Sequence, residues 1–553
     1  MAHNVAQKLA STFKACGVDK FFMLTGGDQA LWIALHEAGI KMIVGHSEPS
    51  AVYMADGYAR ATGATSVTYG QAGPGAANVA AALADSYWAQ SPVMALTGST
   101  ASDMRHANEY QALAQEQMFV PVTRWSGRVE NPGQAAALLR HALQMTLAAG
   151  GPTHLDIPKD FFAKPSEENV PELGLPQLSP AGAGDASVTE GMVRKLLAAE
   201  RPVIFVGEGV NLAKAWDELS SLSSAAGIPM VSSMGGKPAV MDGHSNFMGV
   251  VGRYSSCIAN EILGQADVVL ALGSRLGGLA TNGYTIPSKA AAILQVDHCP
   301  SSFSNPYFPA DCLLADIKLA LRAMLQSMPS GGKESAWLKS CREKRAQWNA
   351  NVRLAIDQAG EAGGISPLAV MSALREYGKD ITVVADTGYM AAWTGVLYPI
   401  QRFDSFFRAT GSLGWALPAS LGVQMARKEK VVCVTGDGGA GYHFTDVETA
   451  VRYKLPVTII ILNNNCLAFE YHEQKYRWNG QVIAEADNFT SVDYAAAARA
   501  LGAAGERVSS GAALRSALKK AMGHSGPTVI EVVTDVEAYP PVTNFEKVMP
   551  RTI

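Results

Sequence analysis

The sequence GDGGAG at positions 436–441 precedes VTIIILNN at positions 457–464, and Asp437 and Asn464 are separated by 464 − 437 = 27 positions. The glycine-rich turn opens a stretch able to be helical, and the apolar run is typical of a buried strand. A carboxylate and an amide at the ends of two strands can bind one hard cation such as Mg²⁺. Backbone N–H groups at a helix start bind phosphates. This stretch therefore predicts a Mg-diphosphate site.

Outward from this stretch, the chain alternates strand-like and helical pieces. That pattern predicts parallel sheets covered by helices on both faces. With 553 residues, we expect three doubly wound α/β domains, at residues 1–164, 190–328 and 365–553. The first and third share a similar rhythm of strands and helices, and the second is Rossmann-like. A Pro-, Gly- and Ser-rich linker at 165–189 and a charged helical connector at 331–364 separate them.

Composition limits the classes of partner. The formal net charge is −4, and no run of Lys and Arg indicates nucleic acid or an anionic membrane. The seven cysteines are scattered without a Cys-x-x-Cys pair, which favours reduced thiols. The N-terminus lacks the pattern of a signal peptide, and no apolar run approaches the ~20 residues of a membrane span. We therefore expect a cytoplasmic protein that binds neither nucleic acid nor a membrane.

A second group of motifs lies near the N-terminus. Glu48 opens an expected helix in GHSEPSA at 45–51, and MADGYAR at 54–60 and QAGPG at 71–75 follow. Alone, Glu48 indicates only a carboxylate favoured by the helix dipole. Together with the motifs at 436–464, it resembles the thiamine diphosphate (ThDP) enzymes, and among them the acetolactate synthase and benzoylformate decarboxylase branch. The resemblance covers the whole chain, in the order pyrimidine-binding, central and diphosphate-binding domain.

The resemblance implies a role for each matching position. Glu48 matches the carboxylate that activates the cofactor, and Leu413 matches the bulky residue that bends it, although a core leucine is the default interpretation of Leu413. The positions that match ligands of Mg²⁺ or of the diphosphate are Asp437, Asn464, Cys466 through its backbone carbonyl, Gly438, Gly439, Gly388 and Tyr389.

Several polar residues have two interpretations each. Gln71 and Gln111 match positions that orient a 2-oxo acid or an acceptor, or they are surface or subunit-contact glutamines. His106 and His472 are proton shuttles or structural histidines. Asp28, in the turn TGGDQ at 25–29, contacts substrate or caps the next helix.

The leading hypothesis is a ThDP- and Mg²⁺-dependent transferase or lyase that decarboxylates a 2-oxo acid and ligates the product to a second carbonyl, as acetolactate synthases do. Gln71, Gln111 and the absence of two adjacent histidines favour carboligation. The alternatives are a non-ligating 2-oxo acid decarboxylase, a lyase of the oxalyl-CoA or 2-hydroxyacyl-CoA type, and a FAD-dependent oxidoreductase. The bulky segment 467–478 lacks the Gly-Met-Val pattern of anabolic acetolactate synthases, which argues against self-condensation of pyruvate.

The central domain and the assembly complete the expectations. Members of the family bind FAD or ADP at turns such as 207–209 and 273–275. Here LGGL at 276–279 replaces the acidic residues of the FAD signature, which favours an empty or vestigial site over FAD. The resemblance also implies a homodimer or homotetramer, with each site formed across a subunit interface.

Overall fold

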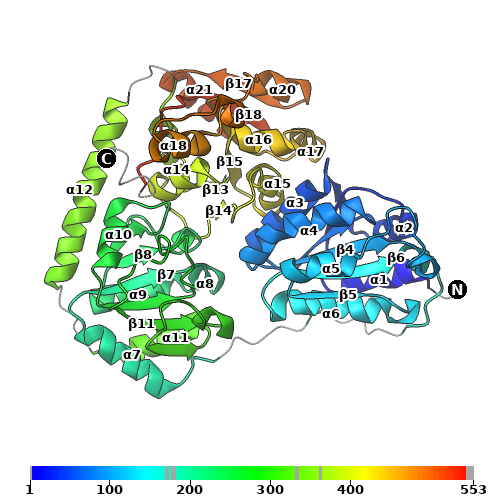
Figure 1. The fold of residues 1–553 in the computed structure, drawn as a ribbon, viewed down its shortest axis with the longest axis horizontal. Coiled ribbons are helices and arrows are strands. Elements are labelled where there is room, and N and C mark those ends of the chain that lie inside the picture. The colour runs from blue at the N-terminus through cyan, green and yellow to red at the C-terminus, as the bar shows by residue number, and fades with distance from the viewer. Residues whose placement is uncertain (1–2, 169–173, 176–181, 330–334, 360–363, 543–553) are drawn as a thin grey trace.

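The computed structural model describes residues 3–168, 174–175, 182–329, 335–359 and 364–542. These residues form three six-stranded sheets in which every pair of neighbouring strands is parallel. Helices cover the sheets (Figure 1). The predicted fold class, three doubly wound parallel α/β units, is confirmed.

The N-terminal sheet has the strand order β2-β1-β3-β4-β6-β5. β3 and β4 are buried along their whole length, as expected of parallel strands with helices on both faces. The strands are β1 (Lys20–Met23), β2 (Lys41–Val44), β3 (Ser66–Gly70), β4 (Val93–Ser99), β5 (Trp125–Arg128) and β6 (Thr153–Pro158). The helices are α1 (Val5–Ala15), α2 (Gln29–Glu37), α3 (Glu48–Thr62), α4 (Pro74–Trp88), α5 (Gln115–Phe119) and α6 (Ala135–Ala148).

The central sheet has the order β12-β11-β10-β7-β8-β9. Read from the β9 edge this is 3-2-1-4-5-6 in chain order, the order of dinucleotide-binding folds. The strands are β7 (Pro202–Val206), β8 (Met230–Ser232), β9 (Phe247–Val250), β10 (Val268–Leu272), β11 (Ala292–Asp297) and β12 (Asp311–Leu314). The helices are α7 (Ala186–Ala198), α8 (Glu208–Leu212), α9 (Trp216–Ala226), α10 (Cys257–Gly264) and α11 (Ile317–Gln326).

The C-terminal sheet has the order β14-β13-β15-β16-β18-β17, which matches the N-terminal sheet strand for strand. The strands are β13 (Ile381–Ala385), β14 (Phe406–Arg408), β15 (Lys430–Gly436), β16 (Thr458–Asn463), β17 (Ala504–Val508) and β18 (Thr528–Val533). The helices are α13 (Pro367–Arg375), α14 (Tyr389–Leu397), α15 (Ala416–Ala426), α16 (Asp437–His443), α17 (Asp446–Arg452), α18 (Ala468–Arg477), α19 (Ala484–Asp487), α20 (Tyr494–Ala500) and α21 (Gly511–Gly523). The similar rhythm of the two sequence blocks is therefore a shared topology.

Helices α3 and α15 join the N-terminal and C-terminal units (Figure 1). They cross so closely that a Cβ atom at Gly57 would overlap the carbonyl oxygen of Ala419, and one at Gly422 would overlap that of Met54. Glycine is the residue that permits such an approach of two backbones. One hydrophobic cluster contains buried side chains of both units, including Phe22 and Trp415. The two sheets thus share a core although they share no strand.

Two segments connect the units. The predicted connector forms α12 (Ala336–Gln358), and residues 331–334 and 360–363 at its ends lie outside the described residues. Much of the predicted linker at 165–189 also lies outside them, and its last residues, from Ala186, begin α7. Among the described residues, no helix combines the length and the apolarity needed to cross a bilayer. All seven cysteines are described, and they are free.

Candidate active site

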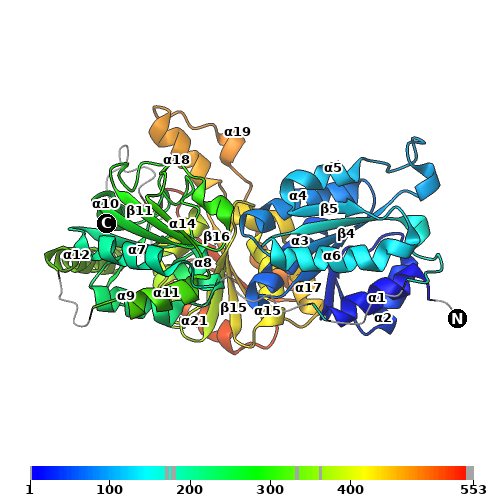
Figure 2. The same ribbon diagram turned by 90° about the horizontal axis from the view of Figure 1, so that it is seen from below.

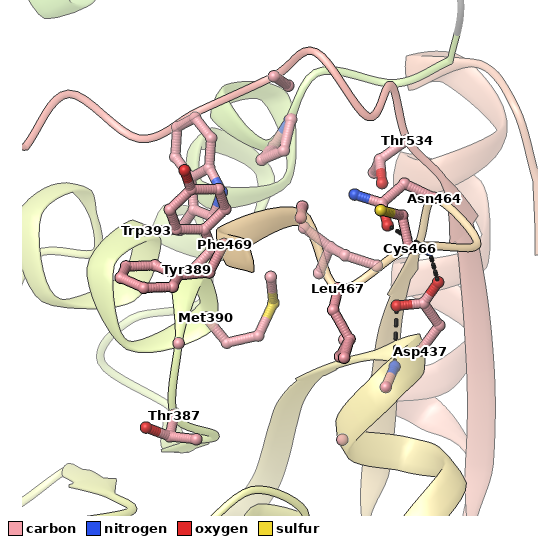
Figure 3. Close-up of a pocket in the computed structure, with 18 of the residues that line it drawn as sticks. Thr387, Tyr389, Met390, Trp393, Asp437, Asn464, Cys466, Leu467, Phe469 and Thr534 are labelled. Carbon is pink, nitrogen blue, oxygen red and sulfur yellow. Dashed lines mark hydrogen bonds between the residues drawn. The ribbon is translucent and has the colours of Figure 1, made fainter. Parts of the chain in front are cut away.

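A cavity of about 340 Å³ lies at the carboxyl ends of strands of the C-terminal sheet (Figure 3). Its walls come from the turn before α14, from the start of α16 and from residues that follow β16 and β18. Tyr254 of the central unit closes one side. In doubly wound sheets ligands bind at this edge, because the loops that leave the strands meet there. The cavity is therefore the first candidate for a cofactor site.

Asp437 and Asn464 point toward each other in this cavity (Figure 3). The backbone N–H of Cys466 donates to Asp437 Oδ2 and to Asn464 Oδ1, at 3.1 Å in each case. Asp437 Oδ1 accepts the N–H of Gly438 at 2.8 Å. Burial raises the pKa of Asp437 to about 6, against the opposing effect of these backbone donors. A carboxylate and an amide oxygen thus converge, as binding of a hard cation requires.

Cys466 can offer the cation only its backbone. Burial raises the pKa of its thiol to about 11, so the sulfur is protonated near neutral pH. Its carbonyl oxygen accepts the N–H of Ala468 at 2.9 Å. The described residues contain no group of three His, Cys, Asp or Glu side chains arranged for a metal ion. The predicted ligand set consists of one carboxylate, one amide and one backbone carbonyl, so it is not a group of three such side chains.

Two helix starts face the same cavity. Gly388, with φ +65°, precedes α14, and Gly436 precedes α16, whose first residues are Asp437, Gly438 and Gly439. A Cβ atom at Gly439 would lie 2.6 Å from both Asp386 Oδ2 and Thr435 Oγ1. The turn therefore has room for backbone only, a feature that it shares with the glycine turns that bind phosphates through N–H groups.

Asp386 lies against this turn at Gly439, and the sequence analysis assigned it no role. Its Oδ1 accepts the N–H groups of Thr387 at 2.9 Å and Gly414 at 3.1 Å, and its Oδ2 accepts the hydroxyl of Thr435 at 2.8 Å. Burial raises the pKa of this carboxyl group to about 6. One side chain thus fixes three of the loops that line the cavity. The available signal was an acidic residue directly after an apolar strand.

The apolar side of the cavity includes Leu413 and Tyr389. Leu413 is half-buried and lines the cavity, so it is not an ordinary core leucine. The Tyr389 hydroxyl and His472 Nδ1 lie 2.7 Å apart in a hydrogen bond. Burial lowers the pKa of His472 to about 4. His472 therefore stands neutral in the wall behind Tyr389, which fits the structural interpretation better than the proton shuttle.

Glu470 is a further carboxylate at the cavity, and the sequence analysis did not select it. It lies near the start of α18, which with α19 projects from the rest of the molecule (Figure 2). Burial raises its pKa, and the nearby carboxylates Asp487 and Glu473 raise it further. The predicted substrate-facing segment thus contributes its first turn to the cavity, whereas Trp478 at its end is 66% exposed.

Glu48 lies at the corresponding edge of the N-terminal sheet. It is the first residue of α3, and the hydroxyl of Ser47 caps that helix by accepting the N–H of Ser50 at 3.2 Å. The Asn78 side-chain amide donates to Glu48 Oε2 at 3.0 Å. Oε1 faces Gly75, where a Cβ atom would lie 3.1 Å away. This arrangement holds one carboxylate oxygen and leaves the other beside a glycine turn.

Gln71 and Gln111 belong to the same edge. Gln71 packs on Gly26, where a Cβ atom would lie 2.8 Å from Gln71 Oε1. Gln111 has a left-handed backbone, φ +64°, and its carbonyl oxygen would lie 2.7 Å from a Cβ atom at Gly73. Glu48, Gln71 and Gln111 therefore surround one turn, residues 71–75. None of them is among the described residues that line the cavity of the C-terminal sheet.

Gln115 fixes that turn, and the sequence analysis missed it. Its side chain is 1% exposed; it accepts the N–H of Gly73 at 2.7 Å and donates to the carbonyl oxygen of Gly98 at 3.1 Å and to Asp156 Oδ1 at 2.8 Å. A buried glutamine amide that bonds to backbone in this way positions a loop. A lone Gln at the start of a five-residue helix gives no pattern by which a single sequence would reveal it.

The structure bears on the cap interpretation of Asp28 and on the exposure of His106. Asp28 is the residue before α2, but its side chain makes no capping hydrogen bond; it accepts the hydroxyl of Tyr69 instead. Burial raises the pKa of Asp28. His106 is exposed on a left-handed backbone, φ +71°. The helix-cap interpretation of Asp28 is therefore wrong.

A separate cavity of about 510 Å³ lies at the central sheet. It includes the predicted nucleotide turns at Gly209 and Gly273–Arg275. The Arg275 guanidinium already donates to the Trp88 carbonyl oxygen at 2.9 Å and lies 5.2 Å from the centroid of that indole ring. The turns predicted from the sequence thus line one cavity, and Arg275 is engaged with the N-terminal unit.

Three family models match this chain. The thiamine pyrophosphate enzyme N-terminal TPP binding domain matches residues 3–118, the central domain of the same enzymes matches residues 189–324, and their C-terminal TPP binding domain matches residues 386–532. Thiamine pyrophosphate is another name for ThDP. The matches together include strands of all three sheets, while β5, β6 and β13 lie outside the matched ranges.

Individual relatives agree along nearly the whole chain. Acetolactate synthase isozyme 3 large subunit of Escherichia coli (strain K12) is 29% identical over 518 residues, which cover 92% of this chain and 90% of that protein. Acetolactate synthase large subunit of Haemophilus influenzae is 28% identical over 529 residues, 93% and 91% of the two chains. Sulfoacetaldehyde acetyltransferase of Castellaniella defragrans is 29% identical over 560 residues, 96% and 92%.

Proposed function

The chain belongs to the thiamine pyrophosphate enzyme family, in its acetolactate synthase-like branch, and we propose that it is a ThDP- and Mg²⁺-dependent carboligase that acts on a 2-oxo acid. In this reaction the bond between the carboxylate and the 2-oxo carbon breaks and CO₂ leaves. The electron pair of that bond stays on the former 2-oxo carbon, which then bonds to the carbonyl carbon of an acceptor. The acceptor oxygen takes up a proton.

The observation that supports the proposal best is the convergence at the C-terminal cavity. Asp437 and Asn464 present two hard oxygens around one backbone N–H, and two helix starts face the same space. A side chain at Gly439 would overlap Asp386, so this turn suits a diphosphate held by backbone N–H groups. The residues present therefore fit ThDP with Mg²⁺. Bound there, ThDP would supply an acidic carbon and an electron-accepting ring for chemistry at the substrate carbonyl.

The residues of this chain have distinct proposed tasks. Asp437, Asn464 and the Cys466 carbonyl hold Mg²⁺, while Gly388, Tyr389, Gly438 and Gly439 hold the diphosphate and Leu413 supports the cofactor ring. Glu48 Oε1, the oxygen that Asn78 leaves free, shares a proton with a ring nitrogen of the cofactor. Gln71 and Gln111 orient the 2-oxo acid or the acceptor beside the turn that they surround.

The two groups of residues meet, in our proposal, across a homodimer, which can pair further into a tetramer. Within the described chain, no residue of the N-terminal unit lines the cavity. A Glu48 side chain that acts there must therefore belong to a second copy of the chain. Large apolar side chains are exposed near both groups: Tyr110 is 81% exposed, Trp478 66% and Tyr442 64%. Burial of such a surface stabilises association of two copies.

Mixing two inactive variants tests the proposed site and the dimer together. At cofactor concentrations too low to saturate Asp437→Asn, we expect Glu48→Gln and Asp437→Asn each to be nearly inactive alone. If each site takes Glu48 from one copy and Asp437 from the other, a mixed dimer has one intact site. Co-refolding or co-expression at equal amounts gives mixed dimers for about half of the population, and so about a quarter of wild-type activity. No recovery of activity in verified mixed dimers would contradict a shared site.

A simple decarboxylase is the second candidate, and Glu470 is the observation that favours it. Its carboxyl group lies at the cavity with a raised pKa, so it can donate a proton to the carbon that loses CO₂. Protonation there yields an aldehyde in place of a ligated product. The same family fold also admits oxalyl-CoA- or 2-hydroxyacyl-CoA-type lyases.

Product analysis separates these candidates. A panel of 2-oxo acids is incubated with enzyme, ThDP and Mg²⁺, with and without acceptor aldehydes, and CO₂ and product masses are measured. We expect CO₂ with a longer-chain hydroxyketone, and a lower share of any aldehyde by-product in Glu470→Gln. An aldehyde as the sole organic product would establish the decarboxylase. Turnover of a CoA thioester but of no free 2-oxo acid would identify the lyase.

For the central cavity we propose that it is not a flavin site, because LGGL at 276–279 replaces the acidic signature and Arg275 is engaged by Trp88. The check is the visible absorbance of the purified protein after it has been incubated with FAD and desalted. Retained flavin whose colour is lost when substrate is added under anaerobic conditions would instead favour the oxidoreductase.

A further inference from the structure

A third cavity, of about 480 Å³, lies between α12 and the ends of α13 and α14. α12 runs along the outer edge of the molecule from the central unit to the C-terminal unit (Figure 1). Three arginines line this cavity, Arg345 and Arg353 from α12 and Arg375 from the end of α13. It shares no lining residue with the candidate active site.

Positive charge exceeds negative charge in this cavity. Asp242 is the one acidic side chain that lines it, and it lies 3.4 Å from the Arg345 guanidinium. The other oxygen of Asp242 accepts the N–H of Ile400 at 2.7 Å. Within the described chain, no carboxylate pairs with Arg353 or Arg375, and both residues are exposed. Two guanidinium groups therefore remain for a ligand.

Burial of the Arg345 guanidinium carries a desolvation cost. Its side chain is only 15% exposed. Burial lowers its pKa, and the charge of Arg375 lowers it further. A buried charge with partial compensation is stabilised by any anion that approaches it. The carbonyl groups at the end of α14 do not serve as this partner, since Lys237 occupies those of Thr394, Gly395 and Tyr398.

The remaining walls are largely apolar. Trp348, Val352 and Ile356 of α12 face Val396 and Leu397 of α14. A bare inorganic ion would leave this surface in water, whereas an organic body would cover it. We propose that the cavity binds a small organic anion with at least two carboxylate or phosphate groups, which the guanidinium groups pair in bidentate fashion.

Isothermal titration calorimetry on the full-length protein saturated with ThDP and Mg²⁺ tests the proposal. The probes are citrate, for carboxylates, and ADP, for phosphates, each prepared at the same free Mg²⁺ concentration as the protein solution because both chelate Mg²⁺. We expect at least one probe to bind the wild-type protein, and its dissociation constant to rise at least about tenfold in the double variant Arg353→Ala/Arg375→Ala. Citrate binding alone would identify a polycarboxylate ligand, and ADP binding alone a phosphorylated one.

A matched control separates the site from general charge effects. Lys339→Ala/Lys344→Ala also removes two positive charges, both from positions on α12 that are not among the described residues lining the cavity. It should bind the probe with wild-type affinity, and thermal unfolding without probe should show that both double variants are folded. Absence of binding by both probes, unchanged binding in the arginine variant, or equal weakening in both variants would overturn the proposal. The readout is binding, so it stands apart from the proposed reaction.

Discussion

The N-terminal and C-terminal sheets have the same strand order and the same chain order of strands, yet their loops carry different groups. The third strand of each leads into a glycine turn and a helix: residues 71–75 include the first two residues of α4, and residues 436–439 include the first three of α16. The C-terminal turn contains Asp437, whereas its N-terminal counterpart is uncharged and packs near Glu48, which follows the second strand. The shared scaffold sets where loops meet, and the residues on them decide what each edge does.

The comparison implies that the N-terminal edge supplies chemistry while the C-terminal edge supplies binding. Glu48→Gln should therefore give the largest effect, a loss of about 10²- to 10⁴-fold in turnover, because the amide cannot share a proton as the carboxylate does. ThDP affinity should change little.

Steady-state turnover and NMR-detected exchange of the C2 proton of bound ThDP measure this effect. Glu37→Gln, a similar change at the exposed end of α2, is the control. Proton exchange at the wild-type rate in Glu48→Gln would refute the assignment of Glu48.

Asp437→Asn should weaken cofactor binding more than it lowers turnover at saturating cofactor. Loss of an outer-shell partner costs a metal site about 10- to 100-fold in affinity, so loss of a direct ligand should raise the dissociation constants of Mg²⁺ and ThDP by at least that factor. Saturating cofactor should restore part of the turnover.

Cofactor titration monitored by protein fluorescence measures the change. Asp380→Asn, at the opposite end of β13, serves as the control. Unchanged cofactor affinity in Asp437→Asn would contradict the proposal that the C-terminal edge supplies cofactor binding.

Gly57→Ala tests the contact that holds the two sheets together. The added methyl group overlaps the Ala419 carbonyl, so overpacking should destabilise the fold by about 1–3 kcal/mol. Gly191→Ala, in open space on α7, should be neutral or slightly stabilising, since alanine favours helices. Denaturant unfolding of the two variants measures the difference, and equal midpoints would show that the crossing is not tight in solution.

The smallest expected effect concerns Lys237, which is 1% exposed and donates to three carbonyl oxygens at the end of α14, at 3.2, 2.6 and 2.5 Å. Burial lowers its pKa from 10.5 to about 8. Between these values the unfolded chain binds more protons than the folded chain, so folding stability rises with pH through this group.

The free energy of unfolding of the wild type minus that of Lys237→Met should therefore increase between pH 8 and 10.5, by at most about 1.4 kcal/mol per pH unit. Below pH 8 it should be constant. Denaturant midpoints at pH 7, 8, 9 and 10 check the sign. A difference that stays constant or falls as pH rises would show that the pKa of Lys237 is not lowered in the folded protein.

Much of the scaffold followed from the sequence because parallel strands buried on both faces are continuous apolar runs. The run at 457–464 became β16, and the helix expected after Gly436 became α16. The GDG and NN motifs pointed to Asp437 and Asn464, and the structure brings these side chains to one N–H group.

The residues that escaped prediction act through contacts distant in the chain. Asp386 bonds to Gly414 and Thr435, and Gln115 bonds to Gly73 and Asp156; no local periodicity marks such partners. Local capping preferences predicted that the Asp28 carboxylate caps the next helix. In the structure it accepts the hydroxyl of Tyr69, which lies on the neighbouring strand β3. Local rules fail where tertiary contacts compete for the same polar atom.

The reciprocal glycine contact between α3 and α15 has a mechanical consequence. Gly57 lies nine positions along α3 from Glu48, roughly 13 Å at the rise of an α-helix, and helices of this length are stiff. α3 thus behaves as a rigid rod that contacts the backbone of the C-terminal unit at Gly57 and carries the Glu48 carboxylate at its N-terminal end. A small displacement at the Gly57 contact moves that carboxylate. The position of the Glu48 carboxylate on the N-terminal unit therefore depends on how the C-terminal unit packs against α3.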